Sequence, residues 1–146
     1  MANEKQYCTF FLKDLFFGVE VLHVQEVFRY HEMTSVPLAP PVVKGLINLR
    51  GQIIIAIDLR SRLGLGERPS GKRPMNIVVR TSDGVVCLLV DEIGDVLEVP
   101  VENYERVPDS VNGLTRELVA GVYKLKDHLL LVLDTEKAAH VEGVHS

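Results

Sequence analysis

The sequence has few of the residues that build a disulfide framework or a nucleic-acid surface. It contains two cysteines, Cys8 and Cys87, both in apolar stretches and neither in a C-x-x-C motif. We expect both to be reduced packing residues rather than partners in a disulfide. The 16 Lys and Arg residues are scattered in a chain of net charge −4, with Lys72-Arg73 the nearest approach to a basic patch. Nucleic-acid binding, which needs a concentrated positive face, is therefore disfavoured.

Long apolar runs are also missing. No window approaches the roughly 18 consecutive apolar residues of a membrane-spanning helix, and residues 1–6 lack the apolar core of a secretory signal. With 47% hydrophobic and 25% charged residues, the 146-residue chain has the composition of one globular domain, or of two small units that share a core. We expect a cytoplasmic protein with no direct membrane insertion.

What the sequence does contain is a series of short apolar runs separated by Gly, Asp and Pro. Runs of β-branched and aromatic residues with such punctuation are typical of an all-β sandwich or barrel. Asp83-Gly84 predicts a hairpin turn because both residue types tolerate positive φ, and Lys13-Asp14 and Lys126-Asp127 resemble weaker forms of the same turn. The expected strands are 6–12, 16–21, 52–57, 76–80, 85–90, 96–99, 119–125 and 128–133.

Only short helices are expected, at residues 21–25, 58–63 and 134–140. Asp58 and Asp134 stand at the start of the last two, where a carboxylate can accept hydrogen bonds from free backbone N–H groups of the first turn. The acid behind the apolar run 53–57 is therefore interpreted as a helix cap and not as a catalytic group.

The second half of the chain repeats the first. Residues 45–58, GLINLRGQIIIAID, match residues 121–134, GVYKLKDHLLLVLD, without a gap at an offset of 76 (121 − 45). Upstream, Val24-Gln-Glu-Val27 lies over Ile93-Gly-Asp-Val96 at an offset of 69 (93 − 24). The sequence therefore predicts two copies of one small β unit, joined near residues 64–74, with extra loop in the second copy at 101–114.

Local motifs for catalysis or metal binding are weak. Residues 66–73, GERPSGKR, nearly spell a phosphate-binding loop, but Arg73 replaces the hydroxyl residue, and the segment follows a helical pattern and precedes a strand. The histidines, His23, His31, His128, His140 and His145, form no H-x-x-x-H pair, and no Ser lies in a G-x-S-x-G elbow. We expect no enzyme activity, no metal and no cofactor, and binding as the function.

Four motifs resemble those of the CheW-type chemotaxis coupling proteins. They are Val24-Gln-Glu-Val27, Lys44-Gly-Leu-Ile-Asn-Leu-Arg-Gly51, Ile57-Asp-Leu-Arg60 and Val90-Asp-Glu-Ile-Gly-Asp-Val-Leu97. The resemblance runs from about Gln6 to about His140. It implies two five-stranded SH3-like β barrels packed together, the first formed by residues 1–68 and the second by residues 69–146, with terminal segments free to exchange.

The resemblance also implies partners. The chain is expected to be a non-enzymatic adaptor that links the histidine kinase CheA, through its regulatory domain, to the cytoplasmic tips of methyl-accepting chemoreceptors, with no small-molecule substrate. This role implies a cytoplasmic protein recruited to membrane-associated receptor arrays. The alternatives are a CheW-like adaptor for a different kinase pathway and a small nucleotide-binding enzyme.

Site residues follow from matching positions. The receptor tip is expected in a groove between the barrels, where an amphipathic helix would meet aliphatic residues and rim charges. The receptor-binding candidates are Val24, Glu26, Val27, Arg50, Val96 and Leu97. Val24 and Val27 are equally credible as core residues of a short helix, and Arg50 as a structural ion pair with Glu26. The weaker kinase-binding candidates are Val36, Pro37, Val42 and Val43, in a loop that is apolar for its position.

Overall fold

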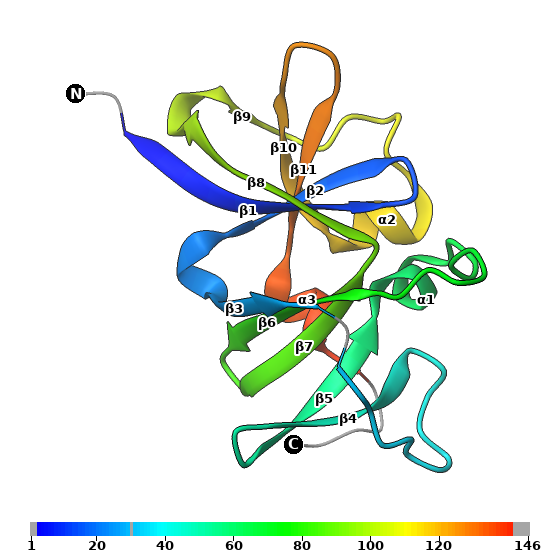
Figure 1. Cartoon of the computed structure of the whole chain (residues 1–146). Coiled ribbons are helices and arrows are strands. Elements are labelled where there is room, and N and C mark those ends of the chain that lie inside the picture. Colours follow the sequence, from blue (N-terminus) through cyan, green and yellow to red (C-terminus); the bar gives the residue numbers. More distant parts are fainter. Residues whose placement is uncertain (1–2, 30, 142–146) are drawn as a thin grey trace.

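The computed structural model describes residues 3–29 and 31–141, which form two β-sheets stacked along the long axis of the molecule (Figure 1). The all-β expectation is confirmed. The helices are short, and the longest of them, α2, covers only six residues.

The first sheet has six strands in the order β8-β1-β2-β11-β10-β9. Its strands are β1 (Glu4–Leu12), β2 (Leu15–Glu20), β8 (Glu92–Pro100), β9 (Tyr104–Glu105), β10 (Val119–Lys124) and β11 (Leu129–Leu133). All neighbours are antiparallel except β11 and β2, which pair in parallel. The two-residue strand β9 accounts for the sixth strand where five were expected.

The second sheet has five strands in the order β3-β6-β7-β5-β4. Its strands are β3 (Val24–Phe28), β4 (Val43–Leu49), β5 (Gln52–Asp58), β6 (Met75–Thr81) and β7 (Gly84–Val90). Here β5 and β7 form the parallel pair. The helical segments are η1 (Val21–His23), α1 (Leu59–Leu63), η2 (Val101–Asn103), α2 (Gly113–Leu118) and α3 (Thr135–Ala139).

The two copies of the repeat fold alike and exchange a hairpin. In the five-stranded sheet β3 pairs with β6 through Val24 and Val79, and in the six-stranded sheet β8 pairs with β1 through Ile93 and Phe10. Both pairs are related by the same 69-residue offset (93 − 24 and 79 − 10), and each is followed by a register shift. The first hairpin of each copy, β1–β2 or β6–β7, is therefore part of the sheet formed by the other copy.

Because of this exchange, the sheets do not follow the expected boundary at residues 68/69. Strands β1 and β2 belong to the sheet of the second copy, and β6 and β7 to that of the first. The division at 68/69 stays a prediction about the units of duplication.

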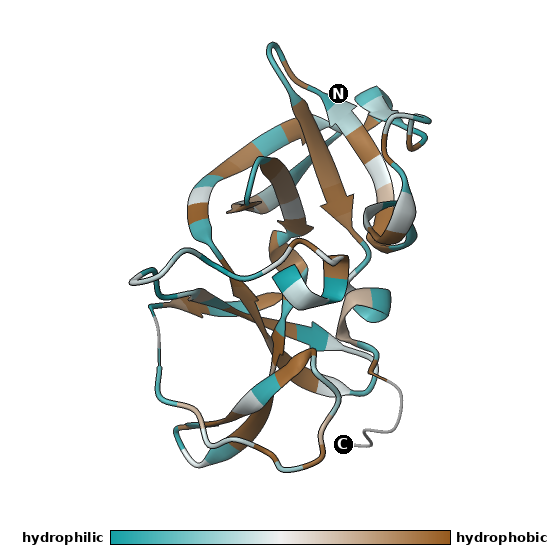
Figure 2. Ribbon diagram, turned by 90° about the vertical axis from the view of Figure 1, so that its right-hand side faces the viewer, coloured by the Kyte–Doolittle hydropathy of each residue, from teal (hydrophilic) through white to brown (hydrophobic). Residues whose placement is uncertain are grey.

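The described residues form three apolar cores, and the alternation along β6 shows how they are separated. Ile77 and Val79 point into a central cluster that takes residues from both sheets, whereas Val78 points into the interior of the five-stranded sheet. The third core, around Tyr7 and Tyr123, fills the six-stranded sheet. Figure 2 shows the hydrophobic residues concentrated on the strands and the hydrophilic ones in the turns. The central cluster is what packs the two sheets together.

The helix expected at 21–25 is wrong beyond His23. Only Val21–His23 form a turn of 3-10 helix, and Val24 opens strand β3. Val24 and Val27 are β-branched and pair with Val79 and Ile77 of β6, so the pleated ladder outcompetes the helix. Strand β4 and helix α2 were absent from the expected elements, whereas helices α1 and α3 are confirmed.

Candidate functional site

The receptor-binding candidates lie mainly on the edge strands of the two sheets. Strand β3 is one edge of the five-stranded sheet, and β8 is one edge of the six-stranded sheet. On β3, Val24 packs against the central cluster while Val27 is 39% exposed; on β8, Leu97 packs inward while Val96 is 56% exposed. Val27 and Val96 are thus accessible to a partner, whereas Val24 and Leu97 face the interior.

Glu26 and Arg50 are brought together by a hydrogen-bonded ion pair between Arg50 Nη2 and Glu26 Oε2. Arg50 reaches β3 from the β4–β5 turn, where Arg50 and Gly51 both have positive φ, at 51° and 88°. The Asn48 side-chain oxygen fixes this turn by accepting from the Gly51 amide at 2.9 Å. The structural ion pair weighed as the rival role of Arg50 is therefore present. The Arg50 side chain remains 69% exposed, so the pair leaves it accessible.

The kinase-binding candidates lie in and beside the connection between β3 and β4. Val36 accepts a turn hydrogen bond from the Ala39 amide at 3.3 Å, and the Val42 carbonyl accepts from the Asp58 amide at 2.8 Å. Pro37 is exposed, Val42 packs against the central cluster, and Val43 begins β4 opposite Ile57. These hydrogen bonds and the packing of Val42 hold the loop in a defined conformation.

The sequence interpretation missed Leu38 in the same loop. Its side chain is fully exposed, and its backbone adopts a left-handed φ of 66°. The left-handed backbone is strained for a residue with a Cβ, and the exposed apolar side chain is unfavourable in water. Strained residues of this kind are frequent at binding sites. Only the flanking Pro residues signalled a turn here, and no local pattern identified Leu38.

Asp58 is a structural residue, as expected. Its carboxylate caps α1 by accepting from the Arg60 amide at 3.0 Å, and it forms ion pairs with Arg68 at 3.0 Å and Lys44 at 4.0 Å. These interactions of the Asp58 side chain hold α1 and the segment around Arg68 in place, which is a structural role.

A second acid, Asp91, has a side chain that is 16% exposed and lies at the centre of an ion network that the sequence interpretation also missed. Arg60 donates to the Asp91 carboxylate from Nε at 2.8 Å and from Nη2 at 2.6 Å, and Arg68 Nε lies 3.0 Å from it. The Lys13 backbone amide donates to the same carboxylate at 2.8 Å. Burial acts to raise the pKa of Asp91, but the hydrogen bonds from Arg60 and Lys13 outweigh it and hold this pKa below its ordinary value. No spacing rule links residues 31 apart, so this network had no local signal.

The segment 66–73 does not form a phosphate-binding loop. It follows α1 and leads to strand β6 at Met75, without the helix that such a loop opens. Arg68 turns inward to Asp58 and Asp91, while Lys72 lies on the surface near Glu92 at 3.9 Å. The segment is an anchored connection between the two copies, which fits its interpretation as a linker.

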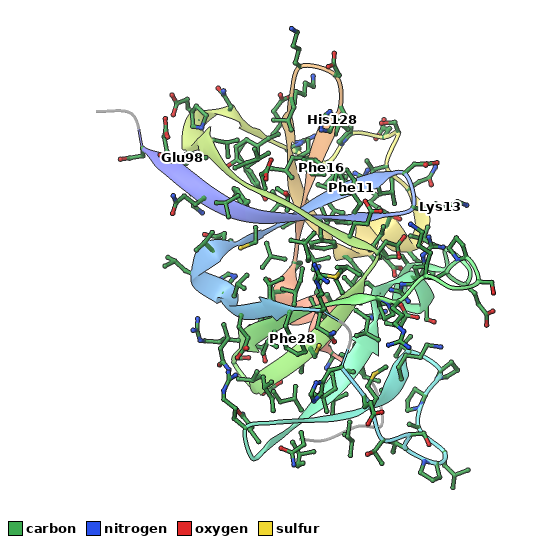
Figure 3. The ribbon with its side chains drawn as sticks, in the orientation of Figure 1. Phe11, Lys13, Phe16, Phe28, Glu98 and His128 are labelled. Atoms are coloured by element: carbon green, nitrogen blue, oxygen red, sulfur yellow. The ribbon has the colours of Figure 1, made fainter. Side chains whose placement is uncertain are left out.

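Aromatic contacts tie the strands of the six-stranded sheet. Phe11, Phe16 and His128, from β1, β2 and the β10–β11 turn, form a row in Figure 3, with ring centroids 4.9 Å and 5.0 Å apart. Tyr7 and Tyr123 share a 3.4 Å hydroxyl contact in the interior, and burial raises the pKa of Tyr7. These side chains stabilise the sheet, and of the receptor candidates Leu97 packs against them, opposite Tyr7.

A cavity of about 690 Å³ lies between β5, β7 and α3, and none of the receptor candidates lines it. Both cysteines are free thiols, and burial raises the pKa of Cys87 to about 12, so it stays protonated. Across residues 3–29 and 31–141 there is no group of three metal-ligating side chains; His145 lies outside these ranges. In the same part of the chain, no helix has both the length and the apolar character that crossing a membrane requires.

Comparison with known proteins identifies the family. The model of the CheW-like domain matches residues 6–142. The chain belongs to the CheW-like domain family. The resemblance seen in its four motifs is thereby confirmed.

Relatives and a solved structure agree with this assignment. The chemotaxis protein CheW of Klebsiella aerogenes is 30% identical over 133 residues, which is 91% of this chain and 80% of that protein. The crystal structure of the scaffolding protein TtCheW from Thermoanaerobacter tengcongensis superposes with a TM-score of 0.86 at 29% identity, over 100% of this chain and 98% of the other. Protein PilI of Pseudomonas aeruginosa is 26% identical over 125 residues, 86% of this chain and 70% of its own length.

Proposed function

We propose that this CheW-like protein is a non-enzymatic chemotaxis adaptor that couples chemoreceptors to the histidine kinase CheA. The observation that carries the proposal is the pair of exposed valines on two edge strands, Val27 on β3 and Val96 on β8, in a chain of the CheW-like family. Edge strands with exposed aliphatic side chains suit contact with another polypeptide, and they offer no group for bond-making.

The receptor tip is an α-helical hairpin whose apolar face would contact Val27 and Val96. Arg50 and Glu26 supply opposite charges at the rim of this surface, where charges set register and partner choice more than affinity. Val24 and Leu97, half-buried beneath, act by holding the exposed valines in place.

The kinase regulatory domain would bind a different surface, the loop with Val36, Pro37, Val42 and Val43, extended by Leu38. The loop is held by two turns and by a bridge in which Thr34 and Leu46 exchange backbone hydrogen bonds at 2.9 Å and 2.8 Å. A preformed loop loses little conformational freedom on binding.

Two separate surfaces allow one molecule to hold both partners at once, which raises the effective concentration at the second contact. The adaptor then works in the cytoplasm and is recruited to membrane-associated receptor arrays by these contacts. Signal passes as a change in packing, without a covalent step in this chain.

A titration of isotope-labelled protein followed by amide NMR tests the assignment. A receptor tip fragment should shift amides of β3 and β8 and leave the loop 36–43 unchanged, and the CheA regulatory domain should do the reverse. Shifts confined to other elements with either partner would refute the proposed surfaces.

A relative that is not named a chemotaxis protein, Protein PilI, motivates one second candidate, an adaptor of the same design in a different kinase pathway. The fold and both surfaces would be the same, and only the partners would differ. If a CheA regulatory domain binds in the titration described above, the chain serves the chemotaxis pathway; if it does not bind, the second candidate is favoured.

A further inference from the structure

Asp91 lies at one of the two places where the described chain passes from one sheet to the other. The chain leaves the six-stranded sheet through η1, residues 21–23, and returns to it at Asp91, the single residue between β7 and β8. Each crossing leads into a strand of the proposed receptor surface: η1 is followed by β3, which carries Val27, and Asp91 by β8, which carries Val96. The geometry of the crossings therefore determines how the two halves of this surface face each other.

The crossing at η1 is lightly held. None of its residues is buried, and its contacts include long hydrogen bonds from Arg80 Nη1 to the carbonyls of Leu22 at 3.2 Å and Val24 at 3.3 Å. The central apolar cluster packs the sheets together, but apolar contact is non-directional and leaves the angle between them weakly specified. Directional contacts are needed to fix this angle. Those of Ser82 with Glu136 and of Arg62 with Lys137 are exposed to solvent, which leaves the less exposed network around Asp91.

The Asp91 crossing is held from both sheets. On the side of the six-stranded sheet, the Asp91 amide donates to the Phe11 carbonyl at 3.1 Å and its carboxylate accepts from the Lys13 amide. On the side of the five-stranded sheet, Arg60 of α1 binds the carboxylate through two nitrogens. Figure 3 shows Lys13 at the end of the β1–β2 hairpin, on the same side as α1 and the connection that follows it.

The partners of Asp91 are themselves fixed. Arg60 Nη1 donates to the Glu67 carbonyl at 3.0 Å, and Arg68 Nη2 donates to the Asp58 carboxylate at 3.0 Å and to the Leu89 carbonyl at 3.2 Å. The side chains of Arg60, Arg68, Asp58 and Asp91 are each at most 16% exposed. Bidentate, charge-assisted hydrogen bonds of this kind are directional and poorly screened by solvent.

We propose that Asp91 is a positioning residue that fixes the angle between the two sheets and thereby aligns Val27 and Val96 on one receptor helix. The inference rests on the proposed receptor surface. Asp91 itself lies at the far end of β8 and touches no receptor residue in this scheme, and it acts through Arg60 and the Lys13 amide. The kinase loop is joined to the strands of the five-stranded sheet and meets the central cluster only through Val42 among its candidates, so we expect it to depend much less on the angle.

The test compares Asp91→Asn with the matched control Asp134→Asn in the full-length protein. Residual dipolar couplings report the relative orientation of the two sheets, and titrations measure affinity for a receptor tip fragment and for the CheA regulatory domain. We expect Asp91→Asn to change the inter-sheet orientation and to lower receptor affinity about tenfold, with kinase affinity unchanged within about twofold. Asp134→Asn should leave all three readouts unchanged.

A second variant covers the case in which Asp91→Asn does not fold. Arg60→Lys keeps the charge but loses the two-nitrogen contact, so it should produce the same pattern with a smaller amplitude. Unchanged orientation and receptor affinity in the folded variants would overturn the positioning role, and so would an equal loss of both partners at unchanged orientation. Val27→Glu separates this result from failure of the proposed function: if it also leaves receptor binding intact, the receptor surface itself is wrong.

Discussion

Asp58 and Asp134 lie 76 residues apart (134 − 58), and each caps the short helix of its copy of the repeat. Asp58 accepts from the Arg60 amide of α1 at 3.0 Å, and Asp134 accepts from the Lys137 amide of α3 at 3.1 Å. They differ in their other contacts, since Asp58 also forms an ion pair with Arg68, whose side chain is 11% exposed. Both copies therefore have the cap, and the ion pair with Arg68 is found at Asp58.

This difference predicts unequal costs of removal. Asp134→Ala should lower the free energy of unfolding by about 1 kcal/mol, the usual loss for a cap. Asp58→Ala should lower it by about 3 kcal/mol or more, because it also leaves the Arg68 charge without one of its buried partners. Urea denaturation measures both, with Asp127→Ala in the exposed β10–β11 turn as the control. Equal losses at the two positions would contradict the role of the Arg68 pair.

The Glu26–Arg50 pair allows its structural and contact roles to be separated. Arg50→Asp should weaken receptor binding yet change the unfolding free energy by less than about 1 kcal/mol, because the pair is largely exposed. The exchanged double variant Glu26→Arg/Arg50→Glu restores an ion pair with reversed direction. If Arg50 contacts the receptor, this double variant should still bind weakly in pull-down and titration. Full recovery of binding would assign Arg50 a structural role only.

Leu38 should show opposite effects on stability and binding. Leu38→Gly relieves a left-handed backbone that costs an L-residue about 1–2 kcal/mol, against an entropic cost of glycine of about 0.5–1 kcal/mol. The melting temperature should therefore stay the same or rise slightly, while affinity for the CheA regulatory domain falls. Leu22→Gly, at another exposed leucine, is the control and should leave kinase affinity unchanged. A Leu38→Gly protein that binds the kinase domain fully would remove Leu38 from the kinase surface.

The ring of Tyr104 lies so close to Gly121 that no larger residue fits at this position. A Cβ at this position would overlap the Tyr104 side chain of β9, so Gly121→Ala should displace β9 and destabilise the protein by about 1–3 kcal/mol. Adding Tyr104→Ala should recover part of the loss, because the space is then open. Thermal unfolding of both variants checks this, with Ala120→Ser on the exposed side of the same strand for comparison. No recovery in the double variant would mean that strain elsewhere sets the cost.

The parts of the fold that sequence predicted are those with a local or repeated signal. The hairpin turns, the caps at Asp58 and Asp134, and the duplicated units all follow from residue types at fixed spacing. The hairpin exchange was not predictable in detail, because both pairings bury the same faces and differ only in which copy supplies a hairpin. Val24 was placed on a helix because three-residue spacing of valines fits either structure when the pairing strand is unknown.

The candidate site divides in the same way. Positions such as Val27 and Arg50 came from matching motifs, whereas Leu38 and the Asp91 network depend on backbone conformation and on contacts between distant residues. Asp91 and Arg60 stand in separate motifs, and only the folded chain brings them to 2.6 Å. Long-range ion networks of this kind leave no periodic trace in a sequence.

The Asp91 network should make stability fall at acid pH with a definite sign. The pKa of Asp91 is lowered in the folded state from its ordinary value of 3.8, so its contribution is complete above about pH 4 and is lost as pH falls through the folded value. At pH 7, Asp91→Asn should be less stable than the unsubstituted protein, because Arg60 loses its counter-charge. Below the ordinary pKa the carboxylate gains a proton on unfolding, and the two unfolding curves should converge. Urea titrations at several pH values between 7 and 2.5 measure this difference, and a gap that stays constant over the whole range would show that the Asp91 charge does not stabilise the junction.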